Sequence, residues 1–444
     1  MITLGDFFKP LNFSNMTIFL AFVFLCEVTG YRLITFFTKD IPFFLRGSVW
    51  IIGLGIVVFT FFTFHFFVPF NSPLILIALL TLFAVSIPFY ARDRAWRRFG
   101  QFLKNNKLPL VVILLVLPKV VIKSSLPPYI WDEMAYHYIS PSTLYLEKIW
   151  TVNDSFYQNL PRLLETAYIA LFSLTKTYSV ARFLHFTIFV TFLLTAYSFF
   201  KKEFGVILAF VFFVFTIFHP ERFLLWSTFG YVDIGTMSFV LIALLAFLDY
   251  LFSGKINRLI FSFAFFGLAA GTKYSALTQL AAFIVIFIII LFFKKSLHVL
   301  KSKKVLIFAF LFLIMGGYWY VKNLALTGNP TYPFLFGCRF EKCDTVSLAY
   351  TNTLIFANIP VIYKTFFLGN KSFEILLPLS IVISLLFGQK KVKVLVLSTL
   401  VFVAVEVLIV KNISGYETRY FYHWLVFTVL LLAAPFSIFK RHES

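Results

Sequence analysis

One apolar stretch decides the class of fold: residues 280–293 read LAAFIVIFIIILFF, and Lys294 and Lys295 follow directly. An uncharged run of this kind is stable only in lipid or in the core of a protein. Similar runs recur along the chain of 444 residues, of which 60% are apolar and 13% are charged. Since a soluble globule cannot cover so much apolar surface, the chain is expected to fold in a membrane.

Apolar runs of about 17 to 25 residues mark the predicted transmembrane helices, of which we expect about thirteen. Their approximate ranges are 15–37, 48–68, 73–90, 108–127, 183–200, 204–219, 225–250, 258–272, 275–293, 304–322, 374–388, 392–410 and 418–438. The predicted fold class is therefore an all-α, polytopic integral membrane protein with juxtamembrane helices on its outward side.

Basic residues lie in short loops that fall on one side of the membrane if the predicted spans alternate. These loops contain Arg92, Arg94, Arg97, Arg98, Lys104 and Lys107; Lys201 and Lys202; Lys255 and Arg258; Lys294 to Lys304; Lys390 to Lys393; and Lys440 with Arg441. Because basic segments resist translocation, this side is expected to face the cytoplasm of a cell with the protein in its inner membrane. The net charge is +20, but the basic residues lie in short loops between apolar runs and do not form one soluble face. No nucleic-acid partner is therefore expected.

The two longest connections, residues 123–182 and 323–373, are predicted on the opposite, extracytoplasmic side, together with most of the acidic residues. Long loops in a compact domain commonly carry function. Within the first loop, Arg162 to Leu174 is apolar enough to form a helix along the bilayer surface. The functional residues are therefore sought on this side.

The densest group of polar side chains follows the fourth predicted span, where residues 131–138 read WDEMAYHY. On an α-helix Asp132 and Tyr136 share one face, and Glu133 and His137 share the adjacent one. Neighbouring carboxyls repel, which raises one pKa toward the range of a general base. A helix cap with interfacial aromatic anchors is an equally good interpretation of the spacing. Glu133 and His137 lack an evident third ligand, so no metal is expected.

Acidic residues inside predicted spans indicate a polar cavity, because a buried carboxylate needs a partner. Asp233 and Glu406 lie in the outer halves of their predicted spans. Their candidate partners are Arg182, Arg222, Lys273 and Arg419. In the first span, Glu27 and Arg32 are expected to pair with each other.

Lys273 and Arg419 each stand at the outward end of a predicted span, with Tyr274 and Tyr420 next to them. A cation at this depth is well placed to hold a phosphate. A basic and aromatic anchor at the membrane surface is the alternative interpretation of both pairs.

Taken in order, these segments resemble bacterial membrane glycosyltransferases of the GT-C type, whose relatives include protein O-mannosyltransferases and lipid A aminoarabinose transferases. The segments are Trp131-Asp132-Glu133 with Tyr136-His137, Ala181 to His185, Gly230 to Asp233, Gly271 to Leu277, Thr327 to Phe334, and Arg419-Tyr420. The resemblance covers residues 108–439, a GT-C-like transmembrane catalytic domain, and leaves residues 1–107 as an N-terminal segment of three spans. Many relatives place the corresponding first loop after their first span, and this chain places it after the fourth.

The resemblance implies an enzyme that moves a hexosyl or pentosyl group from a polyprenyl-phosphate donor to an acceptor hydroxyl outside the cytoplasm, in glycan biosynthesis of the cell envelope. The acceptor would be a lipid, a glycan or a protein. Because the first loop has no Asp-x-Asp sequence, neither a metal nor another cofactor is expected. The implied site residues are Asp132 as general base with Glu133 assisting it, Lys273, Arg419 and Arg182 for the donor phosphate, and Tyr136, His137 and Asp233 for substrate.

Two other functions fit the same sequence features. A transporter or flippase for a lipid-linked sugar would use the same outward cavity and phosphate site without a catalytic base. A polymerase or ligase of the O-antigen type would also have a large outward loop with essential Arg and His residues. A requirement for Asp132 would count against both.

Overall fold

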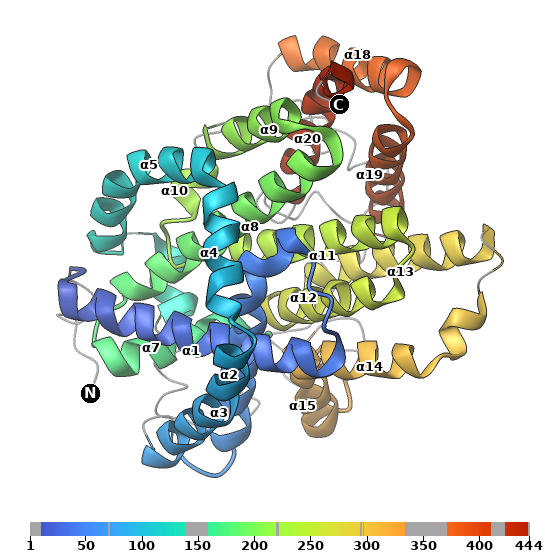
Figure 1. The fold of residues 1–444 in the computed structure, drawn as a ribbon. Coiled ribbons are helices and arrows are strands. Elements are labelled where there is room, and N and C mark those ends of the chain that lie inside the picture. Colours follow the sequence, from blue (N-terminus) through green and yellow to red (C-terminus); the bar gives the residue numbers. More distant parts are fainter. Residues whose placement is uncertain are drawn as a thin grey trace.

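The structure, a computed structural model, describes residues 10–69, 72–128, 130–138, 159–218, 222–293, 295, 297–333, 371–409 and 422–442. These residues form helices joined by turns, and no strand is present among them (Figure 1). The all-α class predicted from hydropathy is therefore confirmed for the described part of the chain. Two of the expected site groups, the side chain of Tyr136 and the whole of Arg419, lie outside the described part.

Eight helical segments of the described residues are long and apolar enough to cross a membrane. They are α1 (Phe13–Phe37), η2 with α2 (Phe43–Ser48 and Val49–Phe64), α3 (Pro73–Arg92), α5 (Lys107–Ser125), α8 (Ser179–Phe204), α11 (Asp233–Ser253), α13 (Ala276–Phe293), and α14, η7 and α15 (Lys303–Phe312, Leu313–Gly317 and Tyr318–Thr327). The chain is thus a multi-pass membrane protein.

The remaining predicted spans correspond to other helices. These are α9 (Val206–Phe218), η5 with α12 (Ile256–Arg258 and Leu259–Thr272), α18 (Lys371–Phe387), α19 (Lys390–Ile409), and α20 with η10 (Tyr422–Ala433 and Ala434–His442). Most of them are shorter than a bilayer requires of a straight helix. The total of about thirteen spans therefore stays a prediction.

Several shorter elements connect these helices: α4 (Ala95–Asn105), η3 (Glu133–Tyr138), α7 (Leu163–Thr175), α10 (Arg222–Trp226) and η6 (Leu297–Lys301). Helix α7 matches the predicted juxtamembrane helix in position but not in surroundings. Its residues from Leu163 to Phe172 are all buried, and it packs against α1, α2, α8 and α12. Because α7 is apolar on nearly every face, it lies within the protein and not along the bilayer surface.

The seventh predicted span begins later than expected. Residues 225–250 were predicted as one helix, but α10 ends at Trp226 and α11 starts at Asp233. The intervening Gly230 belongs to a bend. Asp233 therefore occupies the first turn of α11, where the positive end of the helix dipole stabilises a carboxylate.

The basic helix ends meet at one end of the bundle, which we call the basic end. Lys391 of α19 lies 2.5 Å from Glu203 of α8, and Lys202 of α8 lies 3.8 Å from Asp249 of α11. Arg258, at the start of α12, lies 3.0 Å from the same Asp249. This is the grouping that alternating spans require, and it leaves the starts of α11, α13 and α20 at the opposite end.

Figure 1 shows α11, α12 and α13 side by side, with α18 to α20, drawn in orange and red, packed beside α9. Close approach of helices depends on glycine at two crossings. A Cβ on Gly53 of α2 would lie 1.7 Å from the carbonyl oxygen of Cys26 in α1. A Cβ on Gly316 of η7 would lie 2.2 Å from the carbonyl oxygen of Gly267 in α12. Small residues of this kind allow helices to pack in lipid, where no hydrophobic force drives them together.

The predicted pairing of Glu27 with Arg32 is wrong. The Arg32 guanidinium lies over the ring of Phe89, 3.7 Å from its centroid. Glu27 instead accepts a hydrogen bond from the backbone of Trp50. The physical reason is spacing, since helix positions five apart point in different directions.

Candidate functional site

The two neighbouring acids of the first outward loop, Asp132 and Glu133, differ in burial: Glu133 is buried and Asp132 is partly exposed. Glu133 is fully buried, and both of its oxygens accept from Arg182, Oε1 from Nε at 2.6 Å and Oε2 from Nη2 at 2.7 Å. Oε1 also accepts from the Tyr138 hydroxyl at 3.0 Å and from the Gly230 backbone N–H at 2.6 Å. Arg182 donates in addition to the carbonyl of Leu126. These bonds join η3, α8 and the bend before α11.

The Glu133–Arg182 pair differs from what the sequence led us to expect. Glu133 was expected to assist catalysis, and Arg182 was expected to hold phosphate. Each uses its charge on the other inside the protein, where an unpaired charge would be costly. Burial and the neighbouring Glu133 carboxylate raise the pKa of Tyr138 well above its usual value, so that its hydroxyl remains a donor to Glu133.

The local geometry of this segment also differs from the predicted α-helix. Residues Glu133–Tyr138 form a turn of π-helix, in which positions five apart face each other. Glu133 is therefore paired with Tyr138, and His137 points elsewhere. Its Nδ1 lies 2.9 Å from Oε1 of Glu165 in α7. Glu133 and His137 thus have separate partners and do not form the metal-binding pair considered from spacing.

Asp132 lies half-buried at the edge of this buried network. Trp131 beside it is 62% exposed, so the loop surface is within reach of a substrate at this point. Asp132 itself forms a contact with its surroundings. Of the two neighbouring acids, Asp132 is the one whose carboxylate can meet a ligand.

A polar cavity lies at the end of the bundle opposite the basic end. It is lined by Asp233 and Thr236 of α11, Lys273 and Ser275 of the α12–α13 turn, Gln279 of α13, and Tyr422 and His423 of α20. Lys273 Nζ lies 2.5 Å from Asp233 Oδ1. Lys273, one of the four cations considered, is therefore a partner of Asp233.

Glu406 forms the wall behind this cavity. Its buried carboxylate accepts from Gln279 Nε2 at 2.6 Å and from Trp424 Nε1 at 2.7 Å, and His423 Nε2 lies 2.7 Å away. The Thr278 hydroxyl donates to it at 3.2 Å. The expected Lys or Arg partner is thus replaced, among the described residues, by amide, indole, hydroxyl and imidazole donors.

The turn that carries Lys273 is anchored to the segment 327–333. The Tyr274 hydroxyl donates to the carbonyl of Tyr332 at 2.7 Å and accepts from Asn323 Nδ2 at 2.8 Å. Burial raises the pKa of Tyr274 above its usual value, so the hydroxyl keeps its proton. Helix α15 ends at Gly328, whose φ of 73° favours glycine. Two of the sequence segments noted for resemblance therefore lie in contact.

The loop that contains Asp132 and the polar cavity belong to one connected region. Gly230, which donates to Glu133, lies three positions before Asp233 in the same bend. The Tyr168 hydroxyl donates to the carbonyl of Tyr231 at 2.8 Å, and the ring of His137 contacts that of Tyr231. Hydrogen bonds thus link η3, α7 and the start of α11.

Comparison with protein-family models, with curated proteins and with solved structures finds no match. The function therefore has to be argued from the site itself.

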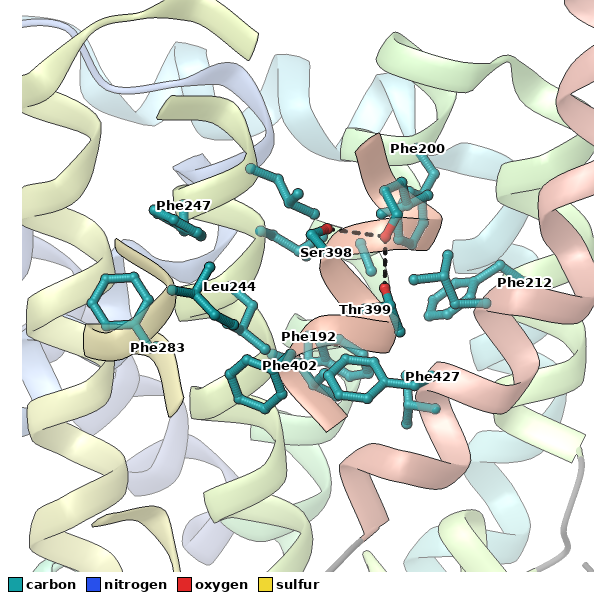
Figure 2. A pocket seen from close by; sticks show the side chains of 18 residues that line it. Phe192, Phe200, Phe212, Leu244, Phe247, Phe283, Ser398, Thr399, Phe402 and Phe427 are labelled. Atoms are coloured by element: carbon teal, nitrogen blue, oxygen red, sulfur yellow. Dashed lines mark hydrogen bonds between the residues drawn. The ribbon is translucent and has the colours of Figure 1, made fainter. Parts of the chain in front are cut away.

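A separate, apolar cavity is lined by the same helices at positions further along them (Figure 2). On α11 the lining passes from Val240 to Leu241 and Leu244, and on α13 from Gln279 to Phe283. The volume of this cavity is about 60 Å³. It lies between α8, α9, α11, α13, α19 and α20.

The few polar groups of the apolar cavity are satisfied within their own helix. The hydroxyls of Ser398 and Thr399 both donate to the carbonyl of Leu395, as Figure 2 shows, at 3.0 and 2.8 Å. Phe192, Phe247 and other rings make up much of the remaining wall. The cavity therefore suits a hydrocarbon chain and offers little to a polar ligand.

Sequence reasoning missed several of these residues. The criterion that selects Asp233 and Glu406 is restricted to acids, so it leaves out Gln279 and His423, which are also polar residues within predicted spans. Glu165 was passed over because it falls in a helix expected to lie on the surface. Gly230 acts through its backbone N–H, and no side-chain signal could have identified it.

Proposed function

We propose that the protein is a membrane glycosyltransferase that transfers a sugar from a polyprenyl-phosphate donor to an acceptor hydroxyl, with Asp132 as general base. One observation carries the proposal: a polar cavity lined by Lys273 and a separate apolar cavity are lined by neighbouring positions of the same helices, α11, α13 and α20. This arrangement complements a ligand with a charged, hydroxyl-rich head and a long hydrocarbon tail. A lipid-linked sugar phosphate is such a ligand.

The donor would lie with its phosphate at Lys273 and its tail among the phenylalanines of the apolar cavity. Asp233 holds the ammonium group of Lys273 at the cavity wall, which reduces the freedom that binding must otherwise remove. The carboxamide of Gln279 and the ring of His423 are oriented by Glu406 and present polar edges to the sugar. Apolar burial of the tail contributes about 25 cal/mol per Å².

The reaction forms a bond between the acceptor oxygen and the anomeric carbon and breaks the bond from that carbon to the phosphate oxygen. The acceptor proton passes to the Asp132 carboxylate, and polyprenyl phosphate leaves with the electron pair. Lys273 stabilises the negative charge that develops on the phosphate. Arg419 retains its proposed role in phosphate binding, and Tyr136 retains its role in substrate binding. His137, expected from the resemblance to bind substrate, is buried against Glu165 and receives no substrate contact in this proposal.

Glu133 and Arg182 receive positioning roles in this proposal. Their buried pair ties the segment with Asp132 to α8 and to the bend before α11. A general base must lie within hydrogen-bond reach of the proton that it accepts, so this anchoring matters for the rate. Neither residue needs to touch the substrate.

The site is proposed to face the extracytoplasmic side of the inner membrane, because it lies opposite the basic end. The acceptor, a lipid, a glycan or a protein, would approach from that side. Envelope glycan synthesis is the setting in which donors and acceptors of these classes meet.

The test is transfer of radiolabelled sugar from a panel of polyprenyl-phosphate sugars to membrane acceptors by the purified protein. Asp132→Asn is expected to lower transfer by about 10²–10⁴-fold, because the base is lost while the shape of the side chain is kept. Glu374→Gln, in α18 and outside both cavities, is the control and should transfer normally.

Two outcomes would overturn the proposal. Transfer by Asp132→Asn at the normal rate would remove the assigned base. Movement of the donor lipid between leaflets of proteoliposomes, without transfer of its sugar and unaffected by Asp132→Asn, would establish a flippase instead.

A further inference from the structure

The N-terminal helices enclose a separate cavity at the basic end, far along the chain from the residues of the proposed transferase site. Its lining includes Glu27 and Tyr31 of α1, Arg46 of η2, Val49 of α2, and Arg98 and Phe99 of α4. None of these residues lines the polar or the apolar cavity described above. The proposed transferase function assigns no role to them.

Glu27 brings an unsatisfied carboxylate oxygen to this cavity. The side chain is 9% exposed and accepts a hydrogen bond from the backbone N–H of Trp50, in the first turn of α2. Its Oε2 atom is buried and has no hydrogen-bond partner among the described residues. A buried carboxylate oxygen without a donor is costly, so a ligand that offers a donor there would be stabilised.

Two arginines bring positive charge to the same cavity. The buried Nε of Arg46 has no hydrogen-bond partner within the described part of the chain. Arg98, from α4, is close enough for its charge to act unfavourably on that of Arg46. Two guanidinium groups that converge in this way are stable with an anion between them, and phosphate matches their geometry.

The nearby Asp93 supplies part of the negative charge that Arg98 faces, but its two oxygens are bonded elsewhere. Its Oδ1 accepts from Arg92 Nε at 3.1 Å, and its Oδ2 accepts from the Tyr31 hydroxyl at 3.2 Å. The groups left to a ligand are therefore the two guanidiniums of Arg46 and Arg98 and one oxygen of Glu27. A ligand that satisfies all three carries both an anion and a cationic donor.

We propose that this cavity binds the head group of a zwitterionic phospholipid, with its phosphate between Arg46 and Arg98 and its primary ammonium on Glu27. Phosphoethanolamine has this chemistry. Phosphocholine lacks the N–H donors that Glu27 requires, since its nitrogen carries three methyl groups.

A membrane lipid is the favoured source because of helix α4. This helix carries Arg97, Arg98 and Lys104 together with Trp96 and Phe99, and in Figure 1 it runs across the direction of α11. An amphipathic basic helix that crosses the spans in this way lies at the head-group level of a bilayer. The apolar side chains of Val49 and Phe99 lie where the head group would continue into its acyl chains.

The experiment measures lipids retained by the purified full-length protein in native mass spectrometry, after equilibration with equal amounts of phosphatidylethanolamine and phosphatidylcholine. Wild type is expected to retain the ethanolamine lipid about tenfold more, which corresponds to one charge-assisted hydrogen bond. The isosteric Glu27→Gln should remove most of this preference. Arg98→Ala should instead lower the retention of both lipids, because both carry the phosphate that Arg98 is proposed to bind. Arg97→Ala is the matched control, because Arg97 lies next to Arg98 on α4 but does not line the cavity.

A second arm distinguishes the source of the head group. Water-soluble O-phosphoethanolamine is added at equal concentration, and the rise in melting temperature is compared with that given by the lipid. A rise with the lipid alone supports a bilayer occupant, and an equal rise with the soluble compound supports the same head-group chemistry with a soluble ligand. Equal retention of both lipids by wild type would overturn the proposal, as would equal losses in Arg97→Ala and Arg98→Ala. Wild-type selectivity decides the question even if a variant does not fold.

Discussion

Arg182 of α8 donates hydrogen bonds to both carboxylate oxygens of Glu133, at 2.6 and 2.7 Å, although 49 positions separate the two residues. The pair lies inside the protein, and Gly230 donates to the same carboxylate from the bend before α11. Three segments distant in sequence therefore meet at one carboxylate. Asp132, the adjacent residue, takes its position from this junction.

Removal of the arginine from this pair should destabilise the fold. Arg182→Met leaves the Glu133 carboxylate buried without its counter-charge, and the expected loss is about 3–5 kcal/mol. Thermal unfolding in detergent would show this as a clear fall in melting temperature. Lys201→Met is the control, because Lys201 is exposed and donates to the carbonyl of Asn105. An Arg182→Met protein that melts like wild type would show that the pair contributes little.

Lys273→Ala should weaken use of the donor while the protein still inserts and folds. Loss of one charge-assisted contact to phosphate raises the KM for the donor roughly tenfold. Steady-state transfer assays across a range of donor concentrations would measure this. Lys304→Ala, at the basic end and bonded to Asn257, should leave the KM unchanged. Unaltered donor kinetics in Lys273→Ala would contradict the phosphate site.

The apolar cavity should determine preference for donors with long tails. Ile286→Trp places a large side chain in the space that the tail would occupy, since Ile286 lines the cavity. We expect a greater loss of transfer from a polyprenyl donor than from a short-chain analogue. Ile289→Trp on the same helix is the matched control, because Ile289 is 41% exposed on the outside of the protein. Equal losses with long and short donors would rule out the cavity as the tail site.

Glu406→Gln should lower the stability of the fold, in addition to any effect on binding of the donor. The carboxylate accepts from Gln279 and Trp424, and an amide cannot accept from all the donors now directed at it. The expected cost is about 1–3 kcal/mol, the penalty of leaving a buried donor unsatisfied. Thermal unfolding compares it with Glu374→Gln, whose side chain is partly exposed. If Glu406→Gln and Glu374→Gln melt at the same temperature, the hydrogen bonds of Glu406 do not contribute to the stability of the fold.

Part of the site could be predicted from the sequence. Asp233 and Glu406 were selected because acids within apolar runs are expensive, and the structure surrounds each with polar partners. Lys273 was among the proposed partners of Asp233 and is observed as a partner. A wider criterion, any polar side chain within an apolar run, would also select His423 and Gln279.

Other assignments depended on geometry that hydropathy does not contain. An α-helical spacing pairs Glu133 with His137, whereas the π-helical turn pairs Glu133 with Tyr138 and directs His137 to Glu165. The sequence suggested phosphate binding for Arg182, which in the folded protein neutralises Glu133. The choice between these arrangements rests on contacts made by α7 and α8, not on the local sequence.

The sequence by itself determined that this chain is an all-α membrane protein with its basic loops on one side. Lipid offers no hydrogen-bond partners to backbone N–H and C=O groups. A long apolar run in a membrane must therefore form a helix, in which these groups bond to each other. Only the tertiary structure decided which helix faces meet, which charges neutralise each other, and where the cavities lie. Those outcomes depend on the rotation and register of packed helices, and segments as far apart as Gln279 and Glu406 show their alignment only after folding.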